Sequence, residues 1–404
     1  MALNADRAPG RVDRSSAGAY SLPIVTETQL QPAPDETEHA GRLRRAQGVA
    51  AAAGVDALLV SPGADLAYLT GYDAIALERL TCLVLPAVGP ARLVVPALEG
   101  PAAQASPVAD LGIEVVTWQE TDDPYALTAG LLPADATTMA VDDRMWAVKA
   151  LALAAAAPHV RQLAAGPVLR ELRMRKSAAE VAALRAAGAA IDRVHARMGE
   201  WLRPDRTERE VGRDIAAAIV AEGHDRTDFV IVASGPNAAS PHAELSDKTI
   251  EAGEPVVVDI GGTAAGYCSD STRTYVTGGA APAEFIAYYA VLLEAQQAQC
   301  AAVRPGVSAQ EIDAVGRDII TTAGHGEQFL HRTGHGIGRE THEEPYIVAG
   351  NAVPIEAGMA FSIEPGIYQA GSHGARIEDI VVVTGDGAER LNTTSRELTR
   401  LDAR

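Results

Sequence analysis

The chain has 404 residues, of which 47% are hydrophobic and 22% charged, a composition typical of a soluble protein that can bury more than one large core. Its 53 acidic and 34 basic residues give a formal net charge of −19, which should repel nucleic acid and anionic membranes. The three cysteines, Cys82, Cys268 and Cys300, are too widely spaced for a Cys-x-x-Cys motif and exclude a disulfide framework. The sequence has neither a signal-peptide pattern nor an apolar run of about 18 residues, so we expect a cytoplasmic protein without a membrane span.

The N-terminal part of the sequence predicts an arm followed by an α/β domain. Residues 1–34 are rich in Pro, Ser and Thr and have no helical or strand period, which is typical of a mobile arm. An Ala- and Arg-rich helix follows to about Gly54, and then short apolar runs of strand length alternate with helical stretches. This alternation predicts an α/β domain over residues 35–166.

A second domain is expected over residues 176–404. A charged connector at 170–176 leads to Ser177, which opens a Ser-x-x-Glu capping-box pattern before a long helix. Further along, the same kind of pattern begins at Thr207 and again at Ser308, each time after a Pro-bearing loop and before a helix that ends near a Gly. This repeat predicts that the second domain consists of two related halves.

Two carboxylates lie within apolar strands of this domain. Asp259 belongs to the run 255–260, and Asp270 belongs to the run 267–276. A hairpin turning at residues 264–265 would place the two aspartates opposite each other with Cβ atoms about 5 Å apart. Such close like charges need a cation to offset their repulsion. The alternative is that Asp259 ends a strand at a Gly turn while Asp270 faces solvent.

Two further segments carry metal-ligand candidates. His335 lies in the Gly-rich segment 333–338, where glycines allow close backbone approach and an imidazole can bind a borderline metal. In residues 359–365, the period-two alternation of a strand places Ser362 and Glu364 on the same face. A single histidine in a Gly-rich loop is also common as a purely structural residue.

The last segment of interest is predicted to be one strand over residues 375–383. Alternation along it would place Arg376 and Glu378 on one face and Asp379 on the other. The shared face of Arg376 and Glu378 is compatible with a functional site in which a guanidinium lies beside a carboxylate. The alternative is a simple Arg–Glu ladder on the surface.

Together these segments resemble the creatinase, prolidase and aminopeptidase P group of pita-bread metallopeptidases, family M24. The shared motifs are Val-Asp-Ile-Gly-Gly, Ser-Asp-Ser-Thr-Arg-Thr, Gly-His-Gly-Ile-Gly with His-Glu-Glu-Pro, Ser-Ile-Glu-Pro-Gly-Ile-Tyr and Arg-Ile-Glu-Asp. The resemblance covers about residues 36–400; near the N-terminus, Asp65 stands where the family pattern has Asn. It implies an α/β creatinase-like N-terminal domain and a C-terminal pita-bread catalytic domain with pseudo-twofold halves.

The resemblance also implies a site with two divalent metal ions per chain. Mn²⁺ is the expected metal, with Co²⁺, Zn²⁺ or Fe²⁺ as alternatives. The five implied ligands are Asp259, Asp270, His335, Glu364 and Glu378, with Asp270 and Glu378 bridging the two ions. Four carboxylates balance the charge of two divalent ions, which makes a buried cluster tolerable. Residues implied to contact substrate or take part in catalysis are His242, His342, Glu364, Tyr368 and Arg376.

The implied activity is hydrolysis of Xaa-Pro bonds by a metal-bridging hydroxide, in a homodimer that acts on small peptides with Pro at the second position. Glu364 is expected to shuttle the proton to the leaving nitrogen. A methionine aminopeptidase is disfavoured because that group resembles the C-terminal half alone. A creatinase-type amidinohydrolase and a non-catalytic pita-bread binding module remain open, although the implied ligand set is complete here and is incomplete in such relatives.

Overall fold

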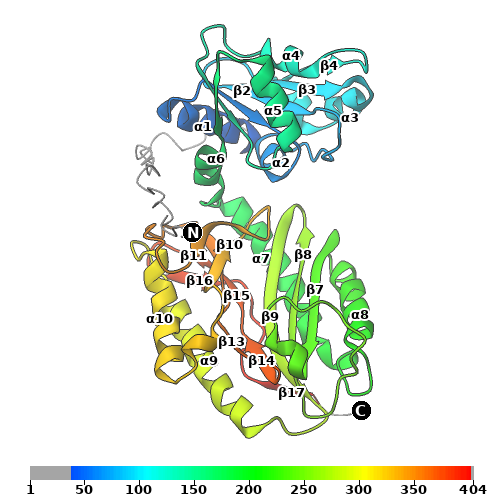
Figure 1. Cartoon of the computed structure of the whole chain (residues 1–404), viewed down its shortest axis with the longest axis vertical. Coiled ribbons are helices and arrows are strands. Elements are labelled where there is room, and N and C mark those ends of the chain that lie inside the picture. The colour runs from blue at the N-terminus through cyan, green and yellow to red at the C-terminus, as the bar shows by residue number, and fades with distance from the viewer. Residues whose placement is uncertain (1–37, 402–404) are drawn as a thin grey trace, which may run out of the picture. The chain divides into compact units, whose positions relative to one another are not determined.

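The computed structural model describes residues 38–401, so the expected N-terminal arm lies outside the described residues. The chain divides between Val168 and Leu169 into two compact units, called here unit 1 and unit 2 (Figure 1). Among the helices of residues 38–401, none combines the length and apolar character that crossing a bilayer requires.

Unit 1 is built on a six-stranded mixed sheet with the order β4-β3-β2-β1-β5-β6. Strands β1, β2 and β3 pair antiparallel, and the remaining neighbours pair parallel. The strands are β1 (Ala57–Val60), β2 (Cys82–Pro86), β3 (Arg92–Pro96), β4 (Glu114–Trp118), β5 (Thr138–Val141) and β6 (Arg161–Ala164). The three strands β1, β2 and β5 are buried along their whole length, which agrees with their continuous apolar runs.

Helices and short 3₁₀ turns connect these strands. The helices are α1 (Glu38–Ala52), α2 (Ala64–Thr70), α3 (Gly100–Gln104), α4 (Pro124–Ala129), α5 (Ala147–Ala156) and α6 (Gly166–Arg173), and the 3₁₀ turns are η2 (Ala97–Glu99) and η3 (Pro107–Leu111). Leu153 of α5 packs with β-strand residues such as Leu59, Val84 and Met139 in one core cluster. The α/β character expected for this part of the chain is confirmed.

The first half of unit 2 combines two helices with a four-stranded sheet of order β17-β9-β8-β7. Its elements are α7 (Ala178–Ala196), η4 (Met198–Glu200), α8 (Glu208–Ala221), β7 (Arg226–Ser234), η5 (Gly235–Ala239), β8 (Pro255–Ala264), β9 (Tyr267–Thr277) and, from the C-terminal end, β17 (Thr399–Leu401). Ile191 of α7, Ile215 of α8 and Val258 of β8 share its core cluster.

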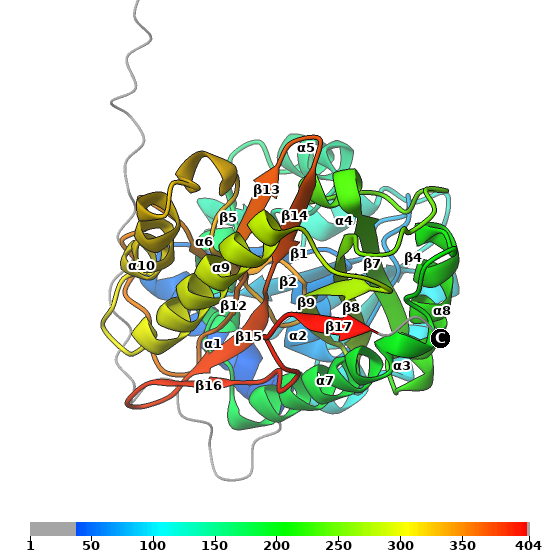
Figure 2. The same ribbon diagram turned by 90° about the horizontal axis from the view of Figure 1, so that it is seen from below.

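The second half repeats this plan with two helices and a five-stranded sheet of order β11-β10-β12-β15-β16. Its elements are α9 (Ala283–Ala302), α10 (Ala309–Thr322), η6 (Gly326–Gln328), β10 (Gly334–Gly336), β11 (Glu343–Ile347), β12 (Ala360–Ile363), the hairpin β13 (Gly366–Gln369) and β14 (His373–Arg376), β15 (Asp379–Val383) and β16 (Ala388–Arg390). In Figures 1 and 2, α9 and α10 lie on one flank of unit 2, α8 lies on the opposite flank, and strands run between them.

Capping boxes begin the helices where the sequence predicts them. The side chain of Ser177 accepts a hydrogen bond from the third helical residue of α7, and that residue's glutamate accepts one in return. The same reciprocal pair starts α8 at Thr207, whereas at Ser308, which begins α10, the amide and the hydroxyl both donate to Glu311 Oε2. Each of the latter two caps forms an isolated β-bridge with a residue further along the chain, Thr207 with Thr249 and Ser308 with Pro354. The predicted relation between the two halves is thus visible in their elements.

The hairpin of β8 and β9 exists, but its predicted register is wrong. Asp259 pairs with Thr272, and Asp270 pairs with Gly261, because the two-residue turn lies at Ala265 and Gly266. Both turn residues have positive φ, 49° and 77°, as a type I′ hairpin turn requires. The two aspartates still share one face of the sheet, but they are diagonal neighbours, which are usually further apart than the directly opposed residues of a pair.

The single strand predicted over residues 375–383 is also wrong. Arg376 ends β14, which pairs with β13, whereas Asp379 begins β15, which pairs with β12. Between them the chain changes sheets: the amide of Ile377 donates to the carbonyl of Pro365, and the amide of Glu378 donates to that of Thr272. Glu378 is therefore held at the junction of the two halves of unit 2.

Candidate metal centre

Five residues from both halves of unit 2 line one cavity of about 460 Å³. They lie on β8, on β9, on β10, directly after β12 and between β14 and β15, and they are the five predicted ligands Asp259, Asp270, His335, Glu364 and Glu378. His335 Nε2 lies 3.1 Å from Glu364 Oε1 and 3.6 Å from Asp270 Oδ2. Donor atoms of Asp270, His335 and Glu378 all lie within 4.8 Å of one another.

Burial and mutual repulsion disfavour the ionised forms of two of these carboxylates, Asp270 and Glu378. Burial raises the pKa of Asp270 well above its usual range, and the charges of Glu378 and Asp259 add to the shift. Burial likewise raises the pKa of Glu378, followed by the charges of Glu364 and Asp259. Glu364 behaves differently: burial opposes ionisation, but the hydrogen bond and charge of His335 prevail and lower its pKa to about 2.

Two carboxylate oxygens point to a bound cation. Asp259 Oδ1 and Glu378 Oε1 are buried and have no hydrogen-bond partner among residues 38–401. A buried, unpaired carboxylate oxygen is costly unless it is a ligand. Four carboxylates and one imidazole are suitable donors for divalent ions of the Mn²⁺ to Zn²⁺ series. The residues present therefore fit a divalent metal site.

Close backbone contacts fix the position of His335. A Cβ atom on Gly334 would overlap the carbonyl oxygen of Ser362, and one on Gly336 would overlap that of Glu344, so only glycine fits at these two positions. The Ser362 hydroxyl accepts from the amide of His335 and donates to Glu364 Oε1, at 3.0 Å in both cases. The predicted shared face of Ser362 and Glu364 is thus confirmed, and it ties two of the candidate ligands together.

Two of the predicted histidines line the same cavity. The His342 ring packs edge-on against the His335 ring, with centroids 4.0 Å apart. Burial and then the neighbouring His335 lower the pKa of His342 to about 4, so its imidazole is neutral at pH 7. His242 follows η5 and also lines the cavity. Both can donate a hydrogen bond to a ligand bound there.

Arg376 and Tyr368 form a supporting layer beside the carboxylates. Arg376 Nη2 donates to Asp259 Oδ2 at 2.5 Å, and its Nη1 donates to the Tyr368 hydroxyl at 2.7 Å and to the carbonyl of Pro241. Its Nε donates to the Thr272 hydroxyl. Arg376 is among the residues that line the cavity and Tyr368 is not, although both residues are almost fully buried. The predicted substrate contact of Tyr368 stays a prediction.

Several residues in or beside the cavity were not predicted from the sequence. Thr272 donates to Glu378 Oε2 at 2.7 Å, and its position two residues after Asp270 on one strand face was an available signal. His331 Nε2 lies 2.9 Å from the Tyr368 hydroxyl. His331 comes four residues before His335 but lies outside β10, so no strand period relates the two histidines. Asp228 and Phe229 also line the cavity, and no motif marks them.

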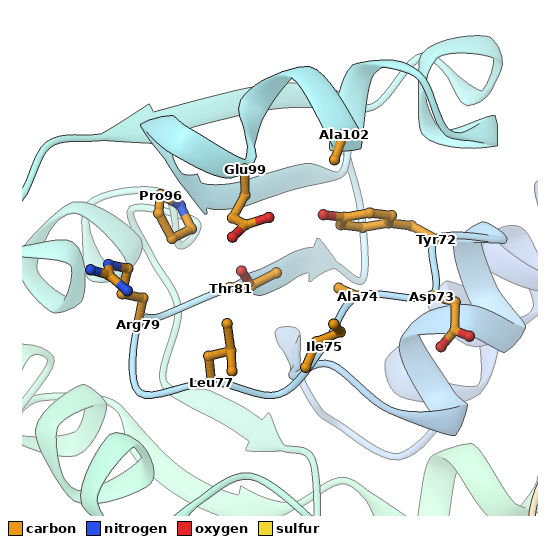
Figure 3. Close-up of a pocket in the computed structure, with 10 residues that line it drawn as sticks. All are labelled: Tyr72, Asp73, Ala74, Ile75, Leu77, Arg79, Thr81, Pro96, Glu99 and Ala102. Atoms are coloured by element: carbon orange, nitrogen blue, oxygen red, sulfur yellow. The ribbon is translucent and has the colours of Figure 1, made fainter.

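Unit 1 contains a separate cavity of about 210 Å³. Figure 3 shows the Glu99 carboxylate and the Tyr72 and Thr81 hydroxyls around it, with Leu77 and Ile75 on the opposite side. Among the residues that line it, the carboxylates are Asp73 and Glu99, without a histidine or cysteine beside them. The lining of this cavity thus lacks the combination of carboxylates and histidines that lines the cavity of unit 2.

Comparison with known proteins defines the class to which this fold and donor set belong. Residues 182–385 match the model of metallopeptidase family M24, and residues 42–175 match that of the creatinase/prolidase N-terminal domain. The chain therefore belongs to metallopeptidase family M24. It is an enzyme that hydrolyses peptides and uses divalent metal.

Individual relatives cover nearly the whole chain. The probable dipeptidase PepE of Mycobacterium tuberculosis is 52% identical over 366 residues, which are 90% of this chain and 97% of the relative. The Xaa-Pro dipeptidase of Lactobacillus helveticus is 35% identical, with 85% and 94% covered. Among solved structures, dipeptidase PepE from Mycobacterium ulcerans superposes with a TM-score of 0.87 at 52% identity, over 90% of this chain and 98% of that one. A prolidase from Thermococcus sibiricus gives a TM-score of 0.85 at 36% identity, over 91% and 100%.

Proposed function

We propose that this chain is an Xaa-Pro dipeptidase that binds two divalent ions, preferably Mn²⁺, through Asp259, Asp270, His335, Glu364 and Glu378. The observation that carries the proposal is the convergence of these five donors on one cavity, with two carboxylate oxygens left unpaired. The names of relatives such as the Xaa-Pro dipeptidase of Lactobacillus helveticus support the substrate class. A homodimer in the cytoplasm stays a prediction.

The protein's own residues have separable tasks in this reaction. Bound divalent ions supply an acidified water and polarise the scissile carbonyl. The hydrogen bond and charge of His335 keep Glu364 ionised at neutral pH. We expect its carboxylate to relay a proton from the attacking water to the leaving nitrogen. His342, neutral with a pKa of about 4, and His242 can donate N–H groups to the oxygen on which charge develops.

A peptide bond before proline requires a dedicated site. Its nitrogen carries no hydrogen and the ring restricts the residue before it, so binding depends on shape and on the peptide's termini. The cavity of about 460 Å³ is within the size range of small-ligand sites. A dipeptide therefore suits the space better than a long chain.

The test combines metal analysis with a small substrate panel. Elemental analysis of the full chain should find two divalent ions, and removal of them should abolish hydrolysis of Met-Pro. Asp270→Ala and Glu378→Ala should each disturb the binding of both ions, whereas His335→Ala should weaken the binding of one.

The substrate panel tests the specificity. Met-Pro should be cleaved faster than Met-Leu and Met-Pro-Gly. Hydrolysis of creatine instead of Met-Pro would favour an amidinohydrolase, and activity that survives confirmed metal loss would contradict the metal mechanism.

A further inference from the structure

The strand β7 contains an irregularity at the edge of the candidate metal centre. Thr227 pairs with Gly262 of β8 and Phe229 pairs with Gly261, so Asp228 is an extra residue without a partner in the register. In a regular strand, neighbouring side chains point to opposite faces. A bulge re-aims them, and here both Asp228 and Phe229 line the cavity.

Apolar side chains separate Asp228 from the metal-binding carboxylates. Ile231 pairs directly with Asp259, and Phe229 pairs with Gly261, which itself pairs with Asp270. A Cβ atom on Gly261 would overlap the Phe229 ring, so this ring lies over the strand beside Asp270. Phe229 and Ile231 thus form an apolar wall next to the candidate metal ligands.

The Asp228 carboxylate is held in place but is only partly neutralised. Its Oδ2 accepts from the Thr263 hydroxyl at 2.6 Å, and its Oδ1 accepts from Arg226 Nε at 2.7 Å. The Asp228 side chain keeps 18% of its surface exposed, whereas Arg226 is 61% exposed. An ion pair with so exposed a partner is weak and can be displaced.

The position of this carboxylate limits which part of a peptide could reach it. Thr263, its hydrogen-bond partner, stands two residues beyond Gly261 on β8, which is about 7 Å along the strand at the usual rise. The α-ammonium of a dipeptide lies next to the scissile carbonyl and must stay at the metal centre. A lysine ammonium, by contrast, stands at the end of a flexible four-carbon stem, which can follow the apolar wall outward.

We propose that Asp228 makes this site selective for dipeptides whose first residue has a cationic side chain, namely Lys-Pro and Arg-Pro. The stem of that side chain packs on Phe229 and Ile231, and its charged end pairs with Asp228 in place of Arg226. The inference rests on the proposed dipeptidase function, because it assigns the first residue of the substrate to this side of the cavity. Asp228 is accordingly a specificity-determining residue.

The test compares substrates that differ only in the charge of the first residue. For the metal-loaded wild type, kcat/KM should follow the order Lys-Pro, then Met-Pro, then Glu-Pro. The isosteric change Asp228→Asn keeps the acceptor for Thr263 and removes the charge. It should lower the Lys-Pro to Met-Pro ratio of kcat/KM by about tenfold, mainly through KM, and it should raise kcat/KM for Glu-Pro.

The matched control is Arg226→Gln, which removes the competing cation and leaves the cavity walls intact. It should raise the Lys-Pro to Met-Pro ratio, the opposite of Asp228→Asn. If Asp228→Asn lowers kcat/KM for all three substrates by the same factor, the carboxylate acts on the α-ammonium or on folding, and the proposal is overturned.

Failure of the proposed function gives a different result. A wild type that cleaves Lys-Leu and Met-Leu as fast as the proline peptides contradicts the Xaa-Pro preference, and the Asp228 comparison is then made on that pair. A wild type that cleaves no dipeptide contradicts the dipeptidase function. The affinities of the protein for Lys-Pro and Met-Pro, measured by calorimetry, then test the inference. Tighter binding of Lys-Pro supports it, and equal affinities overturn it.

Discussion

Arg376 has two possible roles, as a clamp for a substrate carboxylate or as a support for a metal ligand. Its three guanidinium nitrogens donate four hydrogen bonds to Asp259, Tyr368, Thr272 and the carbonyl of Pro241. Because a guanidinium has five N–H groups, little capacity remains for a bidentate bond to substrate. The bonding pattern therefore favours the supporting role for Arg376.

This assignment predicts the effect of Arg376→Lys. A lysine cannot form the same fork of hydrogen bonds, so Asp259 should lose its fixed orientation, and metal affinity and activity should fall by about tenfold or more. The decrease in kcat/KM should be equal for Met-Pro and for its C-terminal amide. A KM that rises for the free dipeptide but hardly for the amide would instead establish a carboxylate clamp.

The raised pKa values of Asp270 and Glu378 predict opposite pH effects with and without metal. Ligands must be deprotonated to bind a cation, so metal content and activity should decrease together as the pH falls. In the metal-free protein, these carboxyls bind protons more tightly folded than unfolded, and stability should fall as the pH rises above about 4. Melting temperatures of both forms across this range test the prediction. A metal-free form that becomes more stable with rising pH would contradict it.

A buried cluster of charged side chains attaches the end of α6 and the segment that follows it to the start of β11. Glu343 Oε1 accepts from Lys176 Nζ at 2.8 Å, and its other oxygen pairs with Arg173. All three side chains are less than a tenth exposed. These two cations prevail over burial and lower the pKa of Glu343. Glu343 directly follows His342, so this anchor also holds a histidine of the site.

We therefore predict that Glu343→Gln is strongly destabilising. It removes the carboxylate that pairs with the buried Lys176 and leaves Arg173 paired with Glu340, which should lower the free energy of unfolding by about 3 kcal/mol and also reduce activity through His342. Glu389→Gln is the matched control, because Glu389 pairs with Arg185 where both side chains are more than 40% exposed, and it should cost less than about 1 kcal/mol. Urea denaturation of both variants gives the comparison, and similar losses would count against the anchor.

Local sequence patterns predict only part of this fold. Capping boxes, apolar runs and the presence of the β8–β9 hairpin follow from local patterns, and those parts are correct. The register failed because two arrangements of Ala264, Ala265 and Gly266 satisfy the same pattern, and the choice depends on backbone φ. The strand break at Glu378 could not be predicted, because alternation continues through it and only pairing with two different sheets reveals it.

The candidate site shows the same limit. The resemblance to family motifs identified all five candidate donors, and the fold brings the elements that carry them to one cavity. Asp228 was missed because its entry into the cavity depends on a bulge, and His331 because its contact with Tyr368 is made between segments 37 residues apart. Such contacts depend on tertiary packing, which leaves no period in the sequence.

The candidate metal donors are confined to one of the two units, whereas each unit has core clusters of its own. All five donors lie in unit 2, on strands or junctions of both its halves, whereas unit 1 has a core cluster of its own residues. Ions bound by these donors would therefore connect the two sheets of unit 2. Their binding energy should stabilise that unit specifically.

This distribution predicts a local response to chelation that hydrogen exchange can measure. Metal at about a hundred times its dissociation constant adds about 2.7 kcal/mol to the folded state, so its removal should lower protection in β8, β9, β12 and β15 by up to about a hundredfold. Strands β1, β2 and β5 of unit 1 serve as the internal reference and should keep their exchange rates. Equal loss of protection in both units would show that the chain unfolds as one cooperative body, and unchanged rates in unit 2 would show that the ions contribute nothing to its stability.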